Sequence, residues 1–369
     1  MRIGIILTGD YSWAGGVYYS LNIIKLLHEI SLTKKLTIVV IVNSGTPTEL
    51  INELPKKNIE LTYLDKKSFF YKLYHKIKGD RFVADINTLK LDVLYPLISY
   101  DTLHPKLNCK PFYWMYDFQH KFLPDLFSSG EIKSRDQVFE DIAVNVRDIV
   151  FSSYDSMTHF EKFFPTSKAN KHVYNFISLI KNEDKGVTNK IVNISTGYFI
   201  VCNQFWPHKN HMAVLKALDA LINEKKKVHI VFTGRYTDER NNKYVSELKE
   251  FIAEKKLENY ITLTGFISRE DQINLIKNAK AVIQPSFFEG WSTVVEDAKA
   301  LNKFLIVSDI SVNKEQLKDH VLFFNPKDHL QLAAHINRLV EKDQGNITFN
   351  YEKNIEKSKE DLVKLFNIK

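Results

Sequence analysis

Two carboxylates eight positions apart, Glu289 and Asp297, are the side chains of this sequence best placed to carry out chemistry. Glu289 follows a short apolar run and precedes Gly290, which permits a tight turn before the next helix. The start of a helix presents unpaired backbone N–H groups, so it can bind an anion. Thr293 and Glu296 have the spacing of a capping box, which predicts Thr293 as the N-cap. The pattern favours a polar site at the end of a buried strand, although a corner with solvated or capping acids fits the same residues.

A basic residue occupies a similar place after another apolar run. Lys209 stands between the run 198–203 and a helical pattern that begins near His211. A lysine in such a loop pairs with a pyrophosphate as a point charge, and the start of the helix adds N–H donors. An exposed lysine beside an N-capping Asn210 would give the same pattern. Lys209 is therefore a candidate cation for a phosphorylated ligand.

The first half of the chain contributes a glycine pair and two polar side chains. Gly15 and Gly16 are expected in the loop between the first strand and the first helix, where glycines let the backbone approach a ligand. Asp117 and His120 follow the aromatic run 111–116, where polar side chains can orient an acceptor hydroxyl. Ordinary turn chemistry explains the glycines as well, and a structural role in the loop explains His120.

These residues need a framework of alternating strands and helices. Apolar runs without the alternation of a half-exposed sheet recur through the first half, as in buried parallel strands. They lie at 3–9, 36–42, 59–64, 91–97, 111–117, 148–153 and 171–176. Between the first two runs, Val17, Leu21, Ile24 and Leu27 have the spacing of an amphipathic helix, which predicts a βαβ unit.

The same pattern restarts after a polar stretch at 180–197, which is typical of a linker. Strands are predicted at 198–203, 228–233, 261–264, 281–284, 304–307 and 321–323, and helices at 211–223, 239–256, 269–278, 293–301 and 355–366. We therefore predict an α/β protein with two doubly wound, Rossmann-like domains that face each other across a cleft. The predicted domains are residues 1–185 and 186–350, followed by a C-terminal helix at 351–369 that returns toward the first domain.

Composition limits the classes of function. The 369 residues suit two domains, and 44% apolar residues is ordinary for a globular protein. A net charge of +7 favours anionic partners but is too diffuse to indicate nucleic acid. Cys109 and Cys202 are far apart, which indicates a reducing compartment, and no apolar run approaches the roughly 20 residues of a membrane helix. We expect a cytoplasmic protein.

The stretch 66–78 mixes lysines with large aromatic side chains. Such a composition is compatible with peripheral contact with an anionic membrane at the inner face of the cell membrane. An ordinary surface helix or loop fits it as well.

Several motifs are missing from the sequence. It contains no G-x-G-x-x-G, no P-loop and no G-x-S-x-G motif. It also lacks an Asp-x-Asp pair, which metal-dependent sugar transferases commonly use to hold a cation. We therefore expect neither a bound metal nor a cofactor.

The frame Pro-Ser-x-x-Glu-Gly-x-Ser at 285–292, with Asp-Ala-x-Ala at 297–300, resembles the acidic signature of the retaining family-four glycosyltransferases (glycosyl transferases group 1), which have the GT-B architecture. The resemblance implies that Glu289 contacts hydroxyls of the donor sugar and that Asp297 contacts the ribose of the nucleotide. Because Asp297 is one methylene shorter than the usual glutamate, Glu296 is the alternative ribose ligand. The donor pocket would further include Gly290, Trp291, Ser292 and Thr293.

Three loops of the second half correspond to the donor site of this family. The resemblance implies that Lys209 binds the donor phosphates. The arginine that usually lies five residues before this lysine is Gln204 here, and Arg235, after the next strand, is a candidate replacement. Phe266 and Ile267 correspond to the loop around the nucleotide base, although Phe266 also fits a plain core position.

The first half adds the remaining expectations. By resemblance, Gly15 and Gly16 lie over the donor phosphates and the reacting sugar. A histidine near the place of His120 holds the donor sugar or the acceptor in the family, and Asp117 is a second candidate there. The candidate catalytic residues are thus Glu289, Lys209, His120 and Asp117.

The resemblance implies a retaining glycosyltransferase that moves a hexosyl group from a nucleotide sugar to a hydroxyl of a saccharide or lipid-linked saccharide, and the lack of an Asp-x-Asp pair favours a metal-independent one. The resemblance points to bacterial surface polysaccharide synthesis and leaves the nucleotide (UDP, GDP or dTDP) open. One alternative is another GT-B nucleotide-sugar enzyme, an epimerase or a hydrolase. The other is a catalytically silent glycosyltransferase-like subunit that binds a partner enzyme, which the departures at Gln204 and Asp297 keep open.

Overall fold

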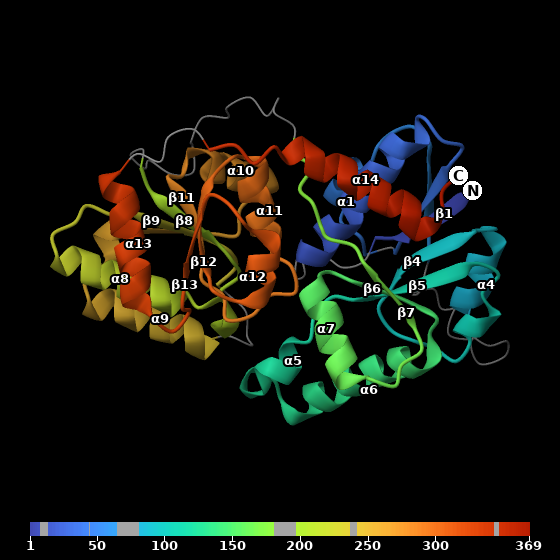
Figure 1. Cartoon of the computed structure of the whole chain (residues 1–369), viewed down its shortest axis with the longest axis horizontal. Coiled ribbons are helices and arrows are strands. Elements are labelled where there is room, and N and C mark those ends of the chain that lie inside the picture. Colours follow the sequence, from blue (N-terminus) through green and yellow to red (C-terminus); the bar gives the residue numbers. More distant parts are fainter. Residues whose placement is uncertain (8–13, 44, 65–80, 181–196, 237–241, 343–346) are drawn as a thin grey trace. The chain divides into compact units, whose positions relative to one another are not determined.

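The computed structural model describes residues 1–7, 14–43, 45–64, 81–180, 197–236, 242–342 and 347–369 (Figure 1). These residues form two compact units. The first unit comprises Met1–Phe118, Ser129–Ile177 and Glu352–Lys369, and the second comprises Gln119–Ser128 and Ser178–Tyr351. Residues 181–196 of the predicted linker and the stretch 66–78 lie outside the described residues.

The first unit contains a seven-stranded parallel sheet, counted over the described residues, with the order β3-β2-β1-β4-β5-β6-β7. Its strands are β1 (Arg2–Ile6), β2 (Thr37–Val42), β3 (Ile59–Tyr63), β4 (Val93–Leu97), β5 (Lys110–Met115), β6 (Asp148–Phe151) and β7 (Asn170–Val173). The predicted α/β class is confirmed. The strand β3 differs from a buried strand because it forms an edge, which leaves Leu61 and Tyr63 exposed.

Helices cover both faces of this sheet. They are α1 (Ala14–Ser31), α2 (Thr48–Asn52), α4 (Arg81–Thr88), α6 (Ser129–Asn145), α7 (Tyr154–Phe163) and α14 (Tyr351–Phe366), with a 3-10 turn η2 (His104–Lys106). On one face, Ile142 of α6 and Phe160 of α7 pack in one cluster with Phe151 of β6. On the other, Phe366 of α14 contacts the rings of Tyr95 and Phe112. The last helix of the chain is therefore part of the first core.

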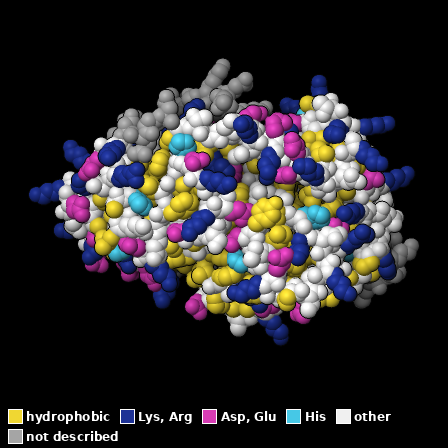
Figure 2. Space-filling model, viewed as in Figure 1, with side chains coloured by type: hydrophobic (Ala, Val, Ile, Leu, Met, Phe, Trp, Pro, Cys, Tyr) yellow, Lys and Arg dark blue, Asp and Glu magenta, His cyan; other side chains and the backbone are white. Residues whose placement is uncertain are grey.

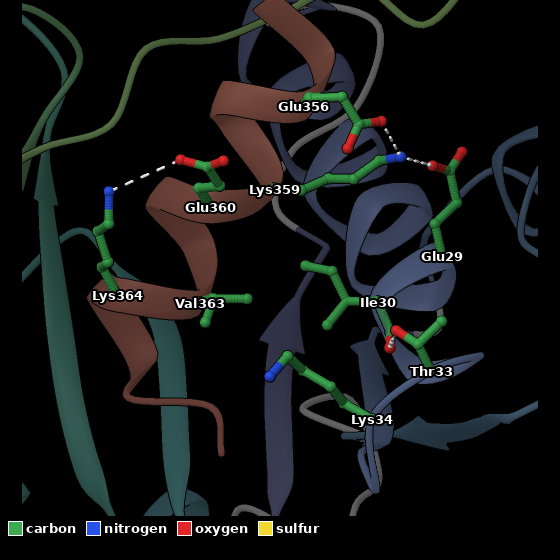
Figure 3. Close-up of a pocket in the computed structure, with 9 residues that line it drawn as sticks. All are labelled: Glu29, Ile30, Thr33, Lys34, Glu356, Lys359, Glu360, Val363 and Lys364. Carbon is green, nitrogen blue, oxygen red and sulfur yellow. Dashed lines mark hydrogen bonds and ion pairs between the residues drawn. The ribbon is translucent and has the colours of Figure 1, made fainter.

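The helices α1 and α14 lie side by side and border a groove of about 470 Å³ (Figure 3). Lys359 of α14 makes ion pairs with Glu29 of α1 at 2.7 Å and with Glu356 at 2.8 Å. Ile30 and Val363 supply apolar lining. The groove shares no residue with the site described below.

The second unit contains a six-stranded parallel sheet within the described residues, with the order β10-β9-β8-β11-β12-β13. Its strands are β8 (Phe199–Cys202), β9 (Ile230–Thr233), β10 (Ile261–Gly265), β11 (Ala281–Gln284), β12 (Phe304–Ser308) and β13 (Val321–Phe324). On one side of β8 the next strands are β9 and then β10. On its other side they are β11, β12 and β13. The order therefore reverses between the neighbours β8 and β11, the place where doubly wound sheets bind ligands.

Helices also cover both faces of the second sheet. The helices of this unit are α5 (Gln119–Phe122), α8 (His211–Asn223), α9 (Asn242–Glu254), α10 (Arg269–Asn278), α11 (Thr293–Ala300), α12 (Ser311–Gln316) and α13 (His329–Glu341), with 3-10 turns η3 (Pro124–Leu126), η4 (Pro207–Lys209) and η6 (Glu258–Tyr260). In Figure 1, α8, α9 and α13 lie together on one face and α10 and α11 on the other.

The two faces follow from alternation along the strands. Phe199 and Val201 of β8 belong to the core beneath α8, α9 and α13, while Ile200 and Cys202 belong to the core beneath α10 and α11. Because both sets are apolar, β8 is a continuous apolar run, as a parallel sheet covered on both faces requires.

No helix in the described part of the chain is long and apolar enough to cross a membrane. Figure 2 shows Lys and Arg side chains dispersed among acidic ones over the visible face, so the net charge of +7 does not gather in one patch there.

Candidate functional site

Lys209 and Glu289 meet at the point where the strand order of the second sheet reverses. Lys209 ends η4, which follows β8, and Glu289 lies in the loop between β11 and α11. The Lys209 Nζ donates to both carboxylate oxygens of Glu289, at 2.6 Å to Oε1 and 2.9 Å to Oε2. Their side chains are 17% and 9% exposed, respectively. The structure thus brings together the cation and the acid that the sequence places 80 positions apart.

Backbone and amide contacts hold the two loops against each other. The Phe287 N–H donates to the His208 carbonyl at 2.8 Å. Asn210 has a left-handed conformation, with φ of 56°, and its side-chain amide donates to the carbonyls of Pro285 at 3.0 Å and Pro326 at 2.8 Å. Asn210 therefore joins the β8 loop to the loops after β11 and β13, and its side chain does not cap α8.

The buried side-chain amide of Gln284 binds the Glu289 carboxylate. Gln284, the last residue of β11, donates from Nε2 to Glu289 Oε1 at 2.7 Å. Its own Oε1 accepts from Asn203 Nδ2 at 2.9 Å. Glu289 is therefore held by one charged and one neutral donor.

Neighbouring histidines do not add positive charge to Lys209. Burial, assisted by the charge of Lys209, holds the pKa of His208 well below its usual value. Burial lowers the pKa of His211 to about 3, and its ring stacks on Phe205 with centroids 4.3 Å apart. Both imidazoles are neutral at pH 7, so Lys209 is the charged member of this basic segment.

The predicted N-cap of α11 is wrong by one position. Ser292, not Thr293, is the N-cap: it has extended backbone angles, with φ of −84° and ψ of 115°, and its hydroxyl accepts from the Val295 N–H at 3.3 Å. Thr293 is the first helical residue, so Glu296 is one position too far along for a capping box. Gln316 of α12 further fixes Ser292, because its amide donates to the Ser292 carbonyl at 2.8 Å.

The signature acid Asp297 has a buried environment of its own. It is 0% exposed, and Arg269 binds both of its oxygens. The Ser178 hydroxyl donates to Asp297 Oδ1 at 2.6 Å. A ribose hydroxyl could reach Asp297 only if these contacts opened.

Glu296, the alternative ribose ligand, is also buried and engaged. Its Oε1 accepts from Lys299 and from Gln316, both at 2.8 Å. Its Oε2 accepts from the Tyr351 hydroxyl at 2.6 Å. Burial and then the charge of Glu296 raise the pKa of Tyr351 well above its usual value, so this phenol remains a donor.

The other donor-loop residues lie around the Lys209–Glu289 pair or farther along the sheet edge. Gly290 and Trp291 are partly exposed and link Glu289 to the cap. The side-chain oxygen of Gln204 accepts from the Arg235 backbone N–H at 3.2 Å, which joins the loops after β8 and β9. The Arg235 guanidinium lies over the ring of Phe266, 5.3 Å from its centroid.

The base loop after β10 has one exposed and one packed residue. Phe266 is exposed, so it does not occupy the core position that its apolar character allowed. Ile267 is partly buried against the core beneath α10 and α11. Both residues follow β10, so they lie at the carboxyl ends of the strands, as do the loops after β8, β9 and β11.

The first-half candidates divide between the two units, and only the second unit contains the Lys209–Glu289 pair. Gly15 and Gly16 lie within the first turn of α1, not in the predicted loop, because the helix begins at Ala14. Asp117 is partly buried in the first unit. His120 belongs to the second unit, on α5, where it is buried and its ring faces Phe127.

Sequence reasoning missed the amides and the arginine that hold the acids. Asn203 and Gln284 are neutral residues at strand ends, a position that could have drawn attention to them, and Asn210 stands just before α8, where it was considered only as a cap. Arg269 begins α10, 28 positions before Asp297, and no motif links the two. Within the described residues, no group of three or more His, Cys, Asp or Glu side chains could hold a metal ion.

Residues 189–360 match the family model of glycosyl transferases group 1. O-antigen chain mannosyltransferase RfbU of Salmonella typhimurium is 29% identical over 159 residues, which cover 42% of this chain and 41% of that protein. O-antigen chain mannosyltransferase B of Escherichia coli is 23% identical over 147 residues, 40% of this chain and 38% of that protein. The match therefore spans about two fifths of the length of these curated relatives.

Solved structures match over nearly the full chain. A glycosyltransferase from Rickettsia africae has a TM-score of 0.64 and 19% identity and covers 98% of both chains. Anabaena HepE in complex with UDP and glucose has a TM-score of 0.69 and 16% identity and covers 100% of this chain and 97% of its own. At these identities the similarity is one of fold, and the fold is GT-B.

Proposed function

We propose that this chain, whose residues 189–360 match the family model of the group 1 glycosyl transferases, moves a hexosyl group from a nucleotide sugar to a hydroxyl of a saccharide or lipid-linked saccharide. The observation that carries the proposal is the contact of Lys209 with Glu289 where the sheet order reverses, inside the matched segment. A cation and a carboxylate side by side suit a ligand that joins a diphosphate to a polyol.

Lys209 and Glu289 are proposed to act on different parts of the donor during transfer. As the anomeric C–O bond breaks, negative charge grows on the departing β-phosphate, and the Lys209 ammonium would stabilise it. Glu289 would accept hydrogen bonds from the sugar hydroxyls and lie near the cationic ring. The acceptor oxygen would attack from the same face and pass its proton to the departing phosphate, so that configuration is retained and no dedicated protein base is needed.

Metal independence belongs to the same proposal. Lys209 and the N–H groups at the start of α11 would meet the leaving-group charge that a divalent cation meets in other sugar transferases. Gln204 and Arg235 are proposed to complete the phosphate side, because the Gln204 side chain binds the backbone of the Arg235 loop. Phe266 and Ile267 are proposed to border the base.

The donor sugar is proposed to be mannose. Two relatives of this chain carry the name O-antigen chain mannosyltransferase, which supports both a mannosyl donor and a surface polysaccharide as the product. We propose a cytoplasmic site of action at the inner face of the membrane, with a lipid-linked acceptor. His120, Asp117, Gly15 and Gly16 remain predicted contacts for the acceptor and the donor.

The ribose contact is the least direct part of the proposal. Asp297 is proposed as its ligand through the signature position, although Arg269 and Ser178 now occupy its oxygens. Ribose binding would therefore have to displace one of these partners. Ribose binding by Glu296 would likewise have to displace a partner, because Tyr351 and Lys299 donate to its oxygens.

The test is a transfer assay with the purified chain, a panel of UDP-, GDP- and dTDP-sugars and saccharide acceptors, with and without EDTA. We expect Glu289→Gln and Lys209→Met each to reduce transfer by about 100-fold or more while the melting temperature stays near wild type, since each removes transition-state stabilisation. Near-wild-type turnover in either variant would overturn the proposal.

A matched control is the exposed ion pair Lys226–Glu341, which has the same N–O distance of 2.6 Å. Lys226→Met and Glu341→Gln should leave transfer unchanged. Product that forms without an acceptor would favour a hydrolase or an epimerase. A complete lack of turnover in the wild-type chain, restored by a second protein, would favour a silent subunit.

A further inference from the structure

We propose that Gln284 is a positioning residue for Glu289 and that Asn203 sets the direction of its amide. The inference rests on the proposed function of Glu289, and it adds residues that the signature does not contain. Asn203 ends the strand-like run before the lysine loop, and Gln284 ends β11. The two residues therefore stand at the ends of the neighbouring strands between which the sheet order reverses.

The contacts form a short relay of hydrogen bonds. Asn203 Nδ2 donates to Gln284 Oε1 at 2.9 Å, and Gln284 Nε2 donates to Glu289 Oε1 at 2.7 Å. Gln284 is 1% exposed, so water cannot take over its role as donor. Its Nε2 also lies 3.3 Å from the Ser286 hydroxyl, which can accept its second hydrogen.

Chemistry fixes the direction of this relay. A carboxylate only accepts hydrogen bonds, so the NH₂ end of Gln284 must face Glu289. The Gln284 oxygen then needs a donor on its far side, and Asn203 supplies one. A flipped Gln284 amide would set oxygen against carboxylate and NH₂ against NH₂, and burial would make both contacts unfavourable. Asn203 thereby selects the orientation that supports the acid.

Gln284 differs from Lys209 in what happens when a donor binds. Lys209 now holds both oxygens of Glu289, at 2.6 and 2.9 Å. A diphosphate competes for that ammonium, because it offers more negative charge than one carboxylate. Gln284 is neutral, so a diphosphate does not draw its amide away from Glu289. Its bond to Oε1 would then keep Glu289 oriented, with Oε2 directed to a sugar hydroxyl.

The first test is Gln284→Met, which keeps the length of the side chain and removes the donor. We expect kcat to fall by about 10- to 100-fold while KM for the nucleotide sugar changes by less than about threefold, because orientation at the reacting sugar is lost and phosphate binding is kept. Affinity for the nucleoside diphosphate alone should match wild type.

Asn313→Ala is the matched control for loss of a buried amide. Asn313 is fully buried in α12, and its Nδ2 donates to the Ser308 carbonyl at 2.8 Å. This variant should lower the melting temperature without a change in kcat or KM. A purely structural role of Gln284 would give the same result for Gln284→Met, and that result would overturn the proposal.

A double-mutant cycle tests the relay. Asn203→Ala should reduce kcat less than Gln284→Met does, because the amide can still visit the correct orientation. In the double variant, Asn203→Ala should add almost nothing, since the amide that it orients is gone. Multiplicative loss of kcat in the double variant would show that Asn203 and Gln284 act separately, which contradicts the relay.

A charge-changing variant reports on the contact without any turnover. In Gln284→Glu two carboxyl groups would stand 2.7 Å apart, at the distance of the present bond, and would share a proton. Their folded-state pKa is then raised above the unfolded value near 4.3, so stability is lost as pH rises through the raised pKa. The melting temperature of this variant should fall between about pH 5 and 8 relative to wild type.

Failure of the proposed function and failure of the positioning role give different experimental results. If the wild-type chain transfers no sugar from any donor, the proposed function fails, and the melting curves of Gln284→Glu still decide whether Gln284 contacts Glu289. A wild-type melting profile for Gln284→Glu would refute the contact. An active wild type with an equally active Gln284→Met would refute the positioning role alone.

Discussion

The two acids of the signature differ sharply in their surroundings. Glu289 retains 9% exposure and is paired with a lysine, whose single ammonium can move toward a phosphate. Asp297 is fully buried. The Arg269 guanidinium donates to both of its oxygens, and the Ser178 hydroxyl donates to Oδ1. Glu289 is therefore the more exposed of the two acids, and Asp297 is part of a buried set of polar contacts.

The Asp297–Arg269 pair is predicted to matter for stability. Arg269→Met leaves a buried carboxylate without its cation, which we expect to cost about 3–5 kcal/mol of unfolding free energy. The double variant Arg269→Met/Asp297→Leu should recover most of that loss, because an apolar pair needs no desolvated charge. Urea unfolding of the three proteins gives the comparison, and a double variant less stable than Arg269→Met would contradict this view.

At this scale, sequence reasoning identified Glu289 and Lys209 because charged residues just after apolar runs are rare and conspicuous. It did not identify Gln284 or Asn203, because a neutral amide at a strand end has no motif of its own. It also could not foresee that Arg269 would bind Asp297, since that contact depends on how α10 and α11 pack beside each other.

At the scale of elements, the start of α11 shows why caps are hard to assign. Ser292 and Thr293 are both capable caps, and the chain uses the one whose backbone is extended. Ser292→Ala should therefore cost about 1 kcal/mol of unfolding free energy, while Thr293→Ala should cost less than about 0.5 kcal/mol. Denaturant titration of both variants measures this, and a larger loss for Thr293→Ala would restore the predicted capping box.

A second element-scale prediction concerns pH and the end of the first sheet. Asp148 begins β6 and is bound by Lys110 of β5 at 3.2 Å and by Asn170 and His172 of β7 at 3.2 and 2.9 Å. Burial alone would raise the pKa of Asp148, but these donors hold it below its usual value. Its stabilisation is therefore present above the unfolded pKa near 3.9 and lost as pH falls through the lower folded value.

Replacement of Asp148 tests this reasoning directly. Asp148→Asn should lower the unfolding free energy at pH 7 by about 2 kcal/mol, since hydrogen bonds to a charged acceptor are lost. As the pH is lowered from 5, the free energy of unfolding should also fall less in the variant than in wild type. Melting curves at a series of pH values provide both numbers, and parallel pH profiles for the two proteins would show that Asp148 does not contribute.

Regular apolar or amphipathic segments were the most predictable elements. The helices α8 and α10 and the strand β11 have the predicted bounds, because their patterns are regular and flanked by polar residues. The first turn of α1 was missed because a glycine pair normally weakens a helix. The assignment of Gln119–Ser128 to the second unit depends on tertiary packing, for which the sequence carries no local signal.

At the scale of the whole molecule, the doubling of the βαβ pattern predicted two doubly wound α/β domains, and the family resemblance implied the GT-B architecture. Each half of the pattern forms one parallel sheet, and α14 joins the first core through Phe366. What the sequence could not supply is the set of side-chain contacts at the place where the second sheet reverses its order. The function proposed here depends on one of those contacts, between Lys209 and Glu289.

Calorimetric titration of three proteins tests that contact most directly: wild type, Lys209→Met and Glu289→Gln, each with a nucleoside diphosphate and with the matching nucleotide sugar. Lys209→Met should weaken both ligands. Glu289→Gln should bind the diphosphate more tightly than wild type, because Lys209 is released from its carboxylate, and should lose the extra affinity contributed by the sugar. If both variants bind both ligands as wild type does, Lys209 and Glu289 are not the donor site and the account is wrong.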